Sequence, residues 1–417
     1  MLSSGTNIDP NVGYDLEAIR ADFPILSRQI HGKPLVYLDN GASSQKPRAV
    51  IDAVSHVYED EYSNVHRGLH FLSNATTDAY EKSREITRKF INAPSVDEII
   101  FTSGSTEALN LVAYGWAMKH LKEGDEIILS QMEHHSNIVP WHFLRERFGV
   151  KLVWVDVEDD GGFSFEKYKA AFSERTKLVT MTHMSNVLGT IVPIKEVVKY
   201  AHDNGVIVCV DGSQGAVHLP VDVVDLDADF YCATGHKLYG PSGIGFLYGK
   251  MELLETMQPF QGGGEMILDV FEDSVTYAKP PHRFEAGTPP IAQAIGMGAA
   301  LEYMETIGRD KILAHENMLR DYATDQLTKI DSLRIFGTTP NKGAILSFEI
   351  EGIHAHDVSM VIDRQGVAVR AGTHCAQPLM KRFDVTSTCR ASFAMYNTKA
   401  EIDVLAEALE KARKFFG

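Results

Sequence analysis

A lysine and a cysteine of this chain stand in surroundings that favour chemistry. Lys237 lies in "TGHKLYG", between glycines and directly after an apolar run, and a lysine enclosed in a loop can lose its charge and act as an amine nucleophile toward an aldehyde. Cys375 lies in "RAGTHCAQPLM" among small and polar residues, with Arg370 and His374 beside it, whereas a cysteine that fills a core has apolar neighbours. Most lysines are solvated, and a thiol needs a partner and a pocket, so the rest of the chain has to decide both cases.

The stretch "FTSGSTEALNLV" (101–112) runs from a predicted strand through a small-residue loop into a predicted helix. Gly104, Ser105 and Thr106 therefore place free backbone N–H groups and hydroxyls at a helix N-terminus, which suits a phosphate. Ordinary helix capping by Ser105 or Thr106 explains the same residues equally well. The stretch alone does not separate the two interpretations.

Two further strand ends carry polar residues. "VIVCVDGSQ" ends in Asp211, with Gln214 soon after, and the carboxyl edge of a parallel sheet is where α/β folds bind ligands. Asp before Gly is also a routine turn. "SQMEHHSN" presents His134 and His135, but no third ligand is spaced to make a metal site, so stacking or hydrogen bonding is favoured over metal binding.

The four signals fit one kind of cofactor. The loop at 104–106 suits a phosphate, Asp211 suits a basic ring nitrogen, His134 can stack on a ring, and the Lys237 amine can react with an aldehyde. Pyridoxal phosphate carries a phosphate, a basic ring nitrogen and an aldehyde. Competing nucleotide motifs fail: "GFLYGK" is too short for a P-loop and lacks the following Ser or Thr, and no G-x-G-x-x-G opens a helix.

The elements that must position these residues alternate between strand and helix. Several short apolar runs, rich in β-branched residues and without polar alternation, predict strands that are buried on both faces. Amphipathic stretches such as 107–121 and 194–205 lie between them. We therefore predict an α/β fold with a mostly parallel sheet covered by helices. The runs are 98–101, 126–130, 151–157, 177–183, 206–211, 229–234 and 244–249.

The alternation of strands and helices ends after the segment 284–308. This segment predicts a helix, and a second helix is predicted in 310–329. Strand-like pieces at 344–350 and 367–372 precede a last helix within 398–416, where Thr398 and Glu401 form a capping box. We predict three parts: an N-terminal segment (1–36) packing on the small domain or a partner subunit, a large domain (37–298), and a small α+β domain (299–417) that carries the cysteine loop.

Composition excludes several classes of protein. The chain has 417 residues and a formal net charge of -16, without a Lys/Arg-rich run, so nucleic acid is not expected as a partner. No signal peptide and no membrane span is visible, which predicts a cytoplasmic protein. The four cysteines form neither a disulfide framework nor a C-x-x-C metal motif, so reduced thiols and no metal are expected.

Together, "NVLGT", "VDGSQ", "TGHKLYGPSGIG", "FEAGTP" and "RAGTHCA" resemble the group II (SUF-type) cysteine desulfurases, which are class V aminotransferase-like enzymes of PLP fold type I. The resemblance extends from "YLDNGASSQKP" (37–47) to the final helix. It implies a seven-stranded, mostly parallel sheet in a large domain, pyridoxal phosphate as the cofactor, and a homodimer.

By position, the resemblance implies that Lys237 forms the Schiff base, that Asp211 pairs with the pyridinium nitrogen, that Gln214 bonds the ring hydroxyl and that His134 stacks on the ring. Arg390 of "STCRASF" would clamp the substrate carboxylate, near Asn186, with Arg370 and His374 also at the substrate. The phosphate ligands would be Ser105, Thr106, Thr234, His236 and, from the opposite subunit, Thr288.

Cys375 matches the sulfur acceptor of the family. The resemblance implies that its thiolate takes sulfur from L-cysteine as a persulfide, leaves L-alanine, and supplies an acceptor protein of the SUF type for iron–sulfur cluster assembly. Many relatives carry His-His before this cysteine, whereas the present chain has Thr373-His374, so no proton relay is expected at residue 373.

Three alternatives stay open. A selenocysteine lyase or cysteine-sulfinate desulfinase would share the scaffold and depend less on Cys375. An aminotransferase of the same fold would form a keto acid and leave Cys375 without a role. A cofactor-free binding module would have no need of Lys237 together with Asp211.

Overall fold

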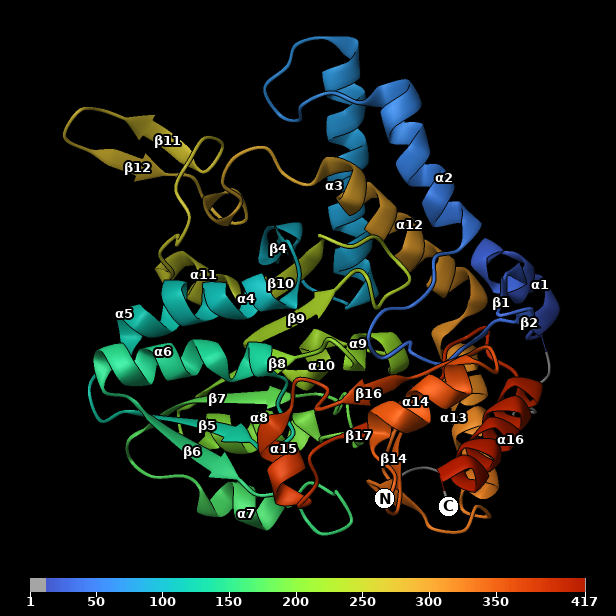
Figure 1. Ribbon diagram of the computed structural model, residues 1–417. Helices are drawn as coiled ribbons and strands as arrows, with labels where there is room; N and C mark the ends of the chain where they lie inside the picture. The colour runs from blue at the N-terminus through green and yellow to red at the C-terminus, as the bar shows by residue number, and fades with distance from the viewer. Residues whose placement is uncertain (1–12, 417) are drawn as a thin grey trace.

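The computed structural model describes residues 13–416. Its largest element is a seven-stranded sheet with the order β4-β10-β9-β8-β7-β5-β6, in which β10 alone runs antiparallel to its neighbours (Figure 1). The predicted mostly parallel, seven-stranded α/β sheet is thereby confirmed. Its strands are β4 (Ile99–Thr102), β5 (Glu126–Ser130), β6 (Lys151–Val155), β7 (Thr176–Thr182), β8 (Ile207–Asp211), β9 (Phe230–Thr234) and β10 (Gly245–Gly249).

Both faces of this sheet are buried, which explains why the strands lack polar alternation. Successive residues of one strand enter different apolar clusters: Ile99 and Phe101 pack on one face, and Ile100 packs on the other. Neighbouring side chains of a strand point to opposite faces, so a strand covered on both sides must be apolar throughout. The helices that provide the cover include α4 (Ser105–Leu111), α6 (Val139–Phe148), α7 (Phe165–Ala170), α8 (Ile194–Asp203), α10 (Val223–Leu226) and α11 (Met251–Thr256).

Three helices pack together beside the sheet, at the upper right of Figure 1. They are α2 (Arg48–His56), α3 (Phe71–Phe90) and α12 (Ile291–Ile307). Gly298 of α12 lies against Ser83 of α3, where a Cβ atom would stand 2.8 Å from the serine hydroxyl oxygen. The close approach of the two helices therefore requires glycine at this position.

A second, antiparallel sheet of order β13-β14-β17-β16 forms with the C-terminal part of the chain. Helices α13, α14 and α16 enclose a separate apolar cluster against it. The last helix begins as predicted, because Thr398 and Glu401 exchange backbone hydrogen bonds as a capping box. The elements are β13 (Leu333–Phe336), β14 (Ile345–Ile350), β16 (Arg370–Gly372), β17 (Thr388–Ser392), α13 (Arg309–Leu327), α14 (Ala355–Asp363), α15 (Gln377–Arg382) and α16 (Lys399–Phe416).

The N-terminal residues that the structure describes run along the C-terminal part. Arg20 of α1 (Leu16–Ala21) forms an ion pair of 3.0 Å with Glu401 of α16, and β3 (Val36–Tyr37) pairs with β15 (Val367–Ala368). Residues 1–12 of the predicted N-terminal segment lie outside the described residues. The domain boundaries at 36/37 and 298/299 stay a prediction, and the second falls inside the continuous helix α12.

A hairpin of β11 (Ile267–Val270) and β12 (Val275–Tyr277) projects from the body of the molecule in Figure 1. Its apolar side chains are exposed; Leu268, Val270 and Phe271 each retain about two thirds of their surface. Leu69 and Phe71, before and at the start of α3, are exposed to an even greater extent. Large exposed apolar side chains are typical of interaction surfaces where they form a contiguous patch.

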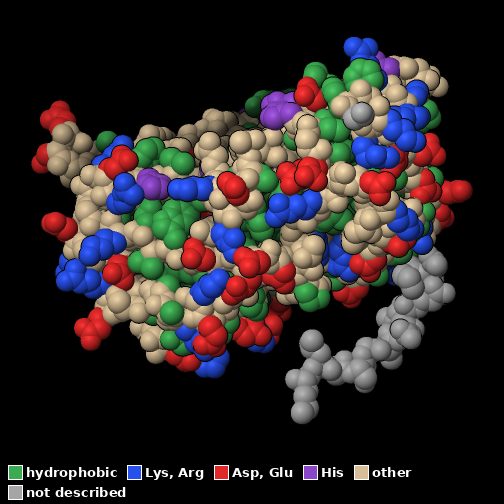
Figure 2. All heavy atoms as spheres, turned by 60° about the horizontal axis from the view of Figure 1, so that its bottom comes forward, with side chains coloured by type: hydrophobic (Ala, Val, Ile, Leu, Met, Phe, Trp, Pro, Cys, Tyr) green, Lys and Arg blue, Asp and Glu red, His purple; other side chains and the backbone are tan. Residues whose placement is uncertain are grey.

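Charged side chains of both signs are interspersed over the face shown in Figure 2. No helix in the described part of the chain is long and apolar enough to cross a membrane.

Candidate active site

The carboxyl ends of five parallel strands meet at one edge of the large sheet, and a cavity of about 470 Å³ opens there. The second sheet closes it from the other side with β16, β17 and the segment that carries Cys375. Parallel strands bring their following loops to one edge, which is how residues more than a hundred positions apart come together. The predicted site residues that line the cavity are Ser105, Thr106, His134, Asn186, Asp211, Gln214, Thr234, His236, Lys237, Arg370, His374, Cys375 and Arg390.

The small-residue loop after β4 forms one end of the cavity. Gly104 has a φ of +148°, and a Cβ atom there would lie 3.3 Å from the hydroxyl of Thr234, so the loop approaches the end of β9 closely. The Thr106 hydroxyl contacts the hydroxyl of Ser136 at 2.8 Å. Backbone N–H groups and several hydroxyls thus face one small volume, as a phosphate requires.

Asp211 ends β8 and is almost completely buried. Its Oδ1 accepts hydrogen bonds from the backbone N–H and the hydroxyl of Ser213, at 2.9 and 2.5 Å. The described residues offer no such bond to Oδ2. One carboxylate oxygen is therefore left for a cationic group in the cavity.

His134 has a defined tautomer. Its Nδ1 accepts the backbone N–H of Ser136 at 3.1 Å, and since a backbone N–H can only donate, the proton of the neutral ring lies on Nε2. Burial, together with the charge of Lys237, lowers the pKa of His134 to about 4. The imidazole is therefore neutral near pH 7 and can stack or donate through Nε2.

Lys237 follows β9, in a loop anchored through the residue before it. The carbonyl oxygen of His236 accepts hydrogen bonds from the backbone N–H of Ser44 at 3.1 Å and from the Lys46 amine at 2.9 Å. Burial lowers the pKa of Lys237 to about 8, against an opposing effect of Asp211. An amine with this pKa is roughly one quarter uncharged at pH 7.5, where an ordinary lysine is uncharged at roughly one part in a thousand.

Cys375 is exposed at the cavity, whereas the other three cysteines of the chain are buried. His374 and Cys375 both have left-handed backbone conformations, with φ of 51° and 55°, and the carbonyl of Cys375 accepts the His135 N–H at 2.7 Å. Left-handed backbone is costly for residues other than glycine, and such conformations cluster at functional sites. Pro378 lies in the first turn of α15, the helix that follows the loop.

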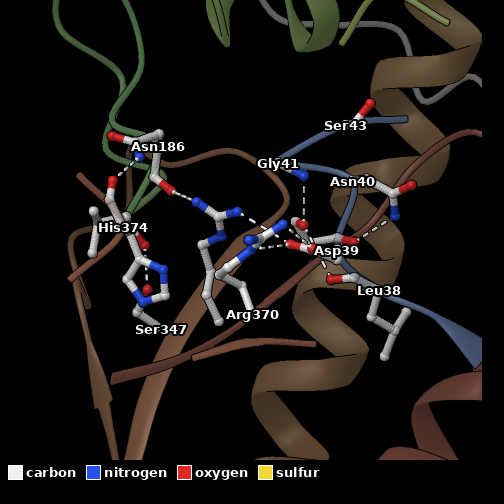
Figure 3. A network of polar contacts seen from close by, with 12 residues as sticks. Leu38, Asp39, Asn40, Gly41, Ser43, Asn186, Ser347, Arg370 and His374 are labelled. Carbon is white, nitrogen blue, oxygen red and sulfur yellow. Dashed lines mark hydrogen bonds and ion pairs between the residues drawn. The ribbon is translucent and has the colours of Figure 1, made fainter. Parts of the chain in front are cut away.

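The ring of His374 is not available as a free base. Its Nε2 contacts the hydroxyl and carbonyl oxygens of Thr388, at 2.9 and 3.1 Å, and burial lowers its pKa to about 3. Its backbone carbonyl accepts the side-chain amide of Asn186 at 2.8 Å (Figure 3). His374 therefore fixes the cysteine loop through main-chain and side-chain contacts.

The two arginines of the cavity share one carboxylate, Asp39. Asp39 lies beside Arg370 in Figure 3. The ion pair between them measures 2.7 Å, and Nη2 of Arg390 lies 3.4 Å from the same carboxylate. Nη1 of Arg390 also donates to the carbonyl of Asn186 at 2.8 Å. Only Thr288 among the predicted site residues does not line the cavity of this chain; it is exposed.

The comparisons with known proteins agree with one another. The model of the family described as Aminotransferase class-V matches residues 36–405. A probable cysteine desulfurase of Streptomyces coelicolor is 52% identical over 410 residues, which are 97% of this chain and 98% of that protein.

The chain belongs to the class-V aminotransferase family. Among solved structures, the Escherichia coli cysteine desulfurase CsdA, with an S-sulfonic acid, is 39% identical with a TM-score of 0.90, covering 97% of this chain and 100% of that one. The apo cysteine desulfurase of Thermococcus onnurineus is 38% identical with a TM-score of 0.91, covering 96% and 98%. The two solved structures are named cysteine desulfurases, and the Streptomyces coelicolor relative is named a probable one.

The residues present fit pyridoxal phosphate, the cofactor of this class-V family. Its phosphate would be bound by Ser105, Thr106 and Thr234. Its ring nitrogen would pair with the free Oδ2 of Asp211, and its aldehyde would react with the partly uncharged amine of Lys237. Two buried atoms around the cavity, Nε of Arg390 and Nδ1 of His374, have no hydrogen-bond partner among the described residues. Buried polar atoms rarely stay unpaired, so a site with orphaned groups is built for a polar ligand.

Sequence reasoning missed several residues that hold this site. Asp39, Ser136 and Ser213 each contact a predicted site residue, and Lys46 anchors the Lys237 loop. The motif "YLDNGASSQKP" contains Asp39 and Lys46, but nothing in the sequence brings it next to residues 236 and 370. For Ser136 and Ser213, the signal was their position within two residues of His134 and Asp211.

A buried ion pair fixes the segment that carries Thr288. Arg84 of α3 binds Glu285 through two contacts of 2.6 and 2.9 Å, and Glu285 also accepts the backbone N–H of Phe101 in β4 at 2.7 Å. Both side chains are almost fully buried. One carboxylate therefore joins the segment before Thr288 to the strand that leads into the phosphate loop.

Replacing Glu285 with Ala should leave the Arg84 charge buried without its main partner. Breaking a buried pair in this way costs about 3–5 kcal/mol, so we expect a fall of several degrees in the melting temperature, measured by calorimetry. Glu302, whose contact with Lys82 is exposed and 3.7 Å long, is the matched control. If the two alanine variants melt together, Arg84 and Glu285 do not stabilise the fold.

The depressed pKa of Lys237 gives a pH-dependent prediction. Only the uncharged amine reacts with an aldehyde, so uptake of pyridoxal phosphate by cofactor-free protein should accelerate as pH rises and level off above about pH 8. The rise in visible absorbance after mixing measures the rate. A rate that keeps climbing toward pH 10 would show an ordinary lysine pKa and contradict the prediction.

Proposed function

We propose that this protein is a SUF-type cysteine desulfurase that converts L-cysteine to L-alanine and takes the sulfur onto Cys375 as a persulfide. The observation that carries the proposal is that one cavity holds Lys237, Asp211 and Arg390 together with an exposed Cys375. An aminotransferase would need the first three and would have no use for a thiol. A binding module would need none of them.

The cofactor supplies an aldehyde that condenses with amines and a ring that accepts the electron pair released at the substrate's α-carbon. Lys237 would provide the amine that holds the cofactor and would move the α-proton. Asp211 would hold the ring nitrogen through its free Oδ2 and favour the protonated ring. His134 is neutral, and its Nε2 carries the ring proton. It can therefore donate a hydrogen bond through Nε2 but cannot accept one there.

Arg390 would orient the substrate, because its planar guanidinium can bind the substrate carboxylate through two hydrogen bonds. Cys375 then attacks the sulfur of the bound L-cysteine: a sulfur–sulfur bond forms, the carbon–sulfur bond breaks, and the carbon takes a proton to become L-alanine. A second thiol then attacks the outer sulfur of this persulfide, so that the acceptor becomes a persulfide and Cys375 leaves as a thiol; a further thiol can form a disulfide with the acceptor and release the outer sulfur as sulfide. An exposed position at the cavity mouth suits both the attack and the delivery.

We propose further that the protein works in the cytoplasm as a homodimer and delivers sulfur to a SUF-type acceptor for iron–sulfur cluster assembly. The exposed apolar hairpin β11–β12, the exposed residues 69–71 and the place of Thr288 outside the cavity of its own chain support the dimer. In a dimer, Thr288 would join the phosphate site of the partner.

The test is to incubate the purified protein with L-cysteine and an external thiol. We expect alanine and sulfide in equal amounts. Pyruvate, a keto acid without alanine, or no product would contradict the proposal. The same assay with selenocysteine and cysteine sulfinate measures the two related activities.

A further inference from the structure

Asp39 occupies an unusual position between the two arginines of the cavity. Its Oδ2 contacts Nη2 of Arg370 at 2.7 Å, and its Oδ1 contacts Nε of Arg370 at 3.3 Å and Nη2 of Arg390 at 3.4 Å. The Arg390 side chain is only 3% exposed, whereas that of Arg370 is 50% exposed. One carboxylate thus serves a buried and an exposed guanidinium at the same time.

The buried arginine is incompletely paired. Its Nε has no hydrogen-bond partner in the described part of the chain, and its Nη2 has only the long contact with Asp39. Nε and Nη2 form one edge of the planar guanidinium, and such an edge binds a carboxylate through two parallel hydrogen bonds. Burial also lowers the pKa of Arg390, so its charge lacks full compensation. An incoming carboxylate is therefore expected on this edge.

The exposed arginine lies at the start of the strand that leads into the cysteine loop. Arg370 is the first residue of β16, an edge strand of three residues that pairs with β17, where Arg370 faces Arg390. Gly372 then bends the chain with a φ of +137°, and His374 and Cys375 follow in left-handed conformations. The ion pair with Asp39 links the half-exposed Arg370, and with it the first residue of this edge strand, to the segment that follows β3.

We propose that Asp39 is a positioning residue that transmits occupation of Arg390 to the Cys375 loop. The inference rests on the proposed function, in which Arg390 binds the substrate carboxylate. When that carboxylate takes the Nε–Nη2 edge, Arg390 draws less on Asp39, and Asp39 pairs fully with Arg370. The strand β16 and the thiol loop are then held in place. In the empty enzyme Asp39 is shared and holds Arg370 less firmly.

The accessibility of Cys375 provides a readout that does not depend on turnover. Cys375 is the exposed thiol among four cysteines, so alkylation of the native holoenzyme by iodoacetamide reports on its loop. L-Alanine carries the carboxylate and no sulfur. Saturating L-alanine should slow alkylation of the wild type about tenfold, within the usual range of coupling between two sites.

Asp39→Asn keeps the shape of the side chain and removes the charge that the two arginines share. In this variant we expect L-alanine to slow alkylation by no more than about twofold. Arg370→Gln, which removes the other partner, should behave in the same way, and the double variant should be no worse than either. Asp39→Glu should restore the coupling. Shielding of Cys375 by the bound ligand itself would be equal in all variants.

A second measurement separates positioning from a general loss of structure. Without Asp39, Arg390 offers its whole charge to the ligand, so the Kd of L-alanine should fall about threefold while kcat for L-cysteine falls. Misfolding would raise the Kd and lower the melting temperature instead.

Two results overturn the inference: no protection by L-alanine in the wild type, or undiminished protection in Asp39→Asn. Failure of the proposed function has a different signature, since wild type that releases no alanine from L-cysteine can still show protection that depends on Asp39. That result would retain the coupling and remove the assigned reaction.

Discussion

Cys375→Ala is expected to lower alanine formation from L-cysteine by about three orders of magnitude or more, because the variant has no thiolate to accept the sulfur. The remaining cysteines cannot replace it. Cys209 and Cys232 are buried in the large sheet, and burial raises the pKa of Cys389 to about 12. Their thiols are inaccessible and protonated near pH 7.

Alanine and sulfide are measured after incubation with L-cysteine, and mass spectrometry should find one added sulfur atom on the Cys375 peptide of the wild type. Cys389→Ala is the matched control, since it removes a thiol of β17 that does not line the cavity. Selenide release from selenocysteine should survive in Cys375→Ala, because selenium leaves more easily. Undiminished turnover of L-cysteine by this variant would show that no persulfide on Cys375 is required.

Lys237→Ala is expected to produce a comparable loss of turnover, about three orders of magnitude, because the variant lacks the amine that holds the cofactor and moves the α-proton. After borohydride reduction, the wild type should gain the mass of the cofactor on the peptide that contains Lys237. The variant should gain none, while cofactor that is held by Asp211 and the phosphate cradle can still be present.

Lys342 makes a demanding control for this experiment. It is also buried, and burial lowers its pKa to about 7, yet it lies in a different cavity and donates to the carbonyl of Gly337. Lys342→Met should retain the cofactor mass on Lys237 and the full turnover. If the Lys237→Ala variant still gained the cofactor mass after borohydride reduction, a low pKa rather than the position in the cavity would decide which lysine binds the cofactor.

Much of the fold followed from local patterns. The seven apolar runs became the seven strands of the large sheet, because strands that are covered on both faces need apolar residues throughout. The capping box of Thr398 and Glu401 was equally local, since both partners lie within one helical turn. The pairing of β3 with β15 was not predictable, because two-residue strands carry no periodic signal and their partners lie more than three hundred residues apart.

The sequence by itself identified the candidates for chemistry that the structure brings to one cavity: Lys237 after its strand, Asp211 at the end of another, and Cys375 among polar neighbours. A site residue next to the end of a parallel strand can be found in this way, because all such ends share one edge. Only the tertiary structure decided how the residues act. It placed Cys375 at the mouth of the same cavity, turned His374 toward Thr388, and set Asp39 between Arg370 and Arg390. These arrangements arise from contacts between different elements of the fold, and such tertiary contacts leave no spacing that a sequence can show.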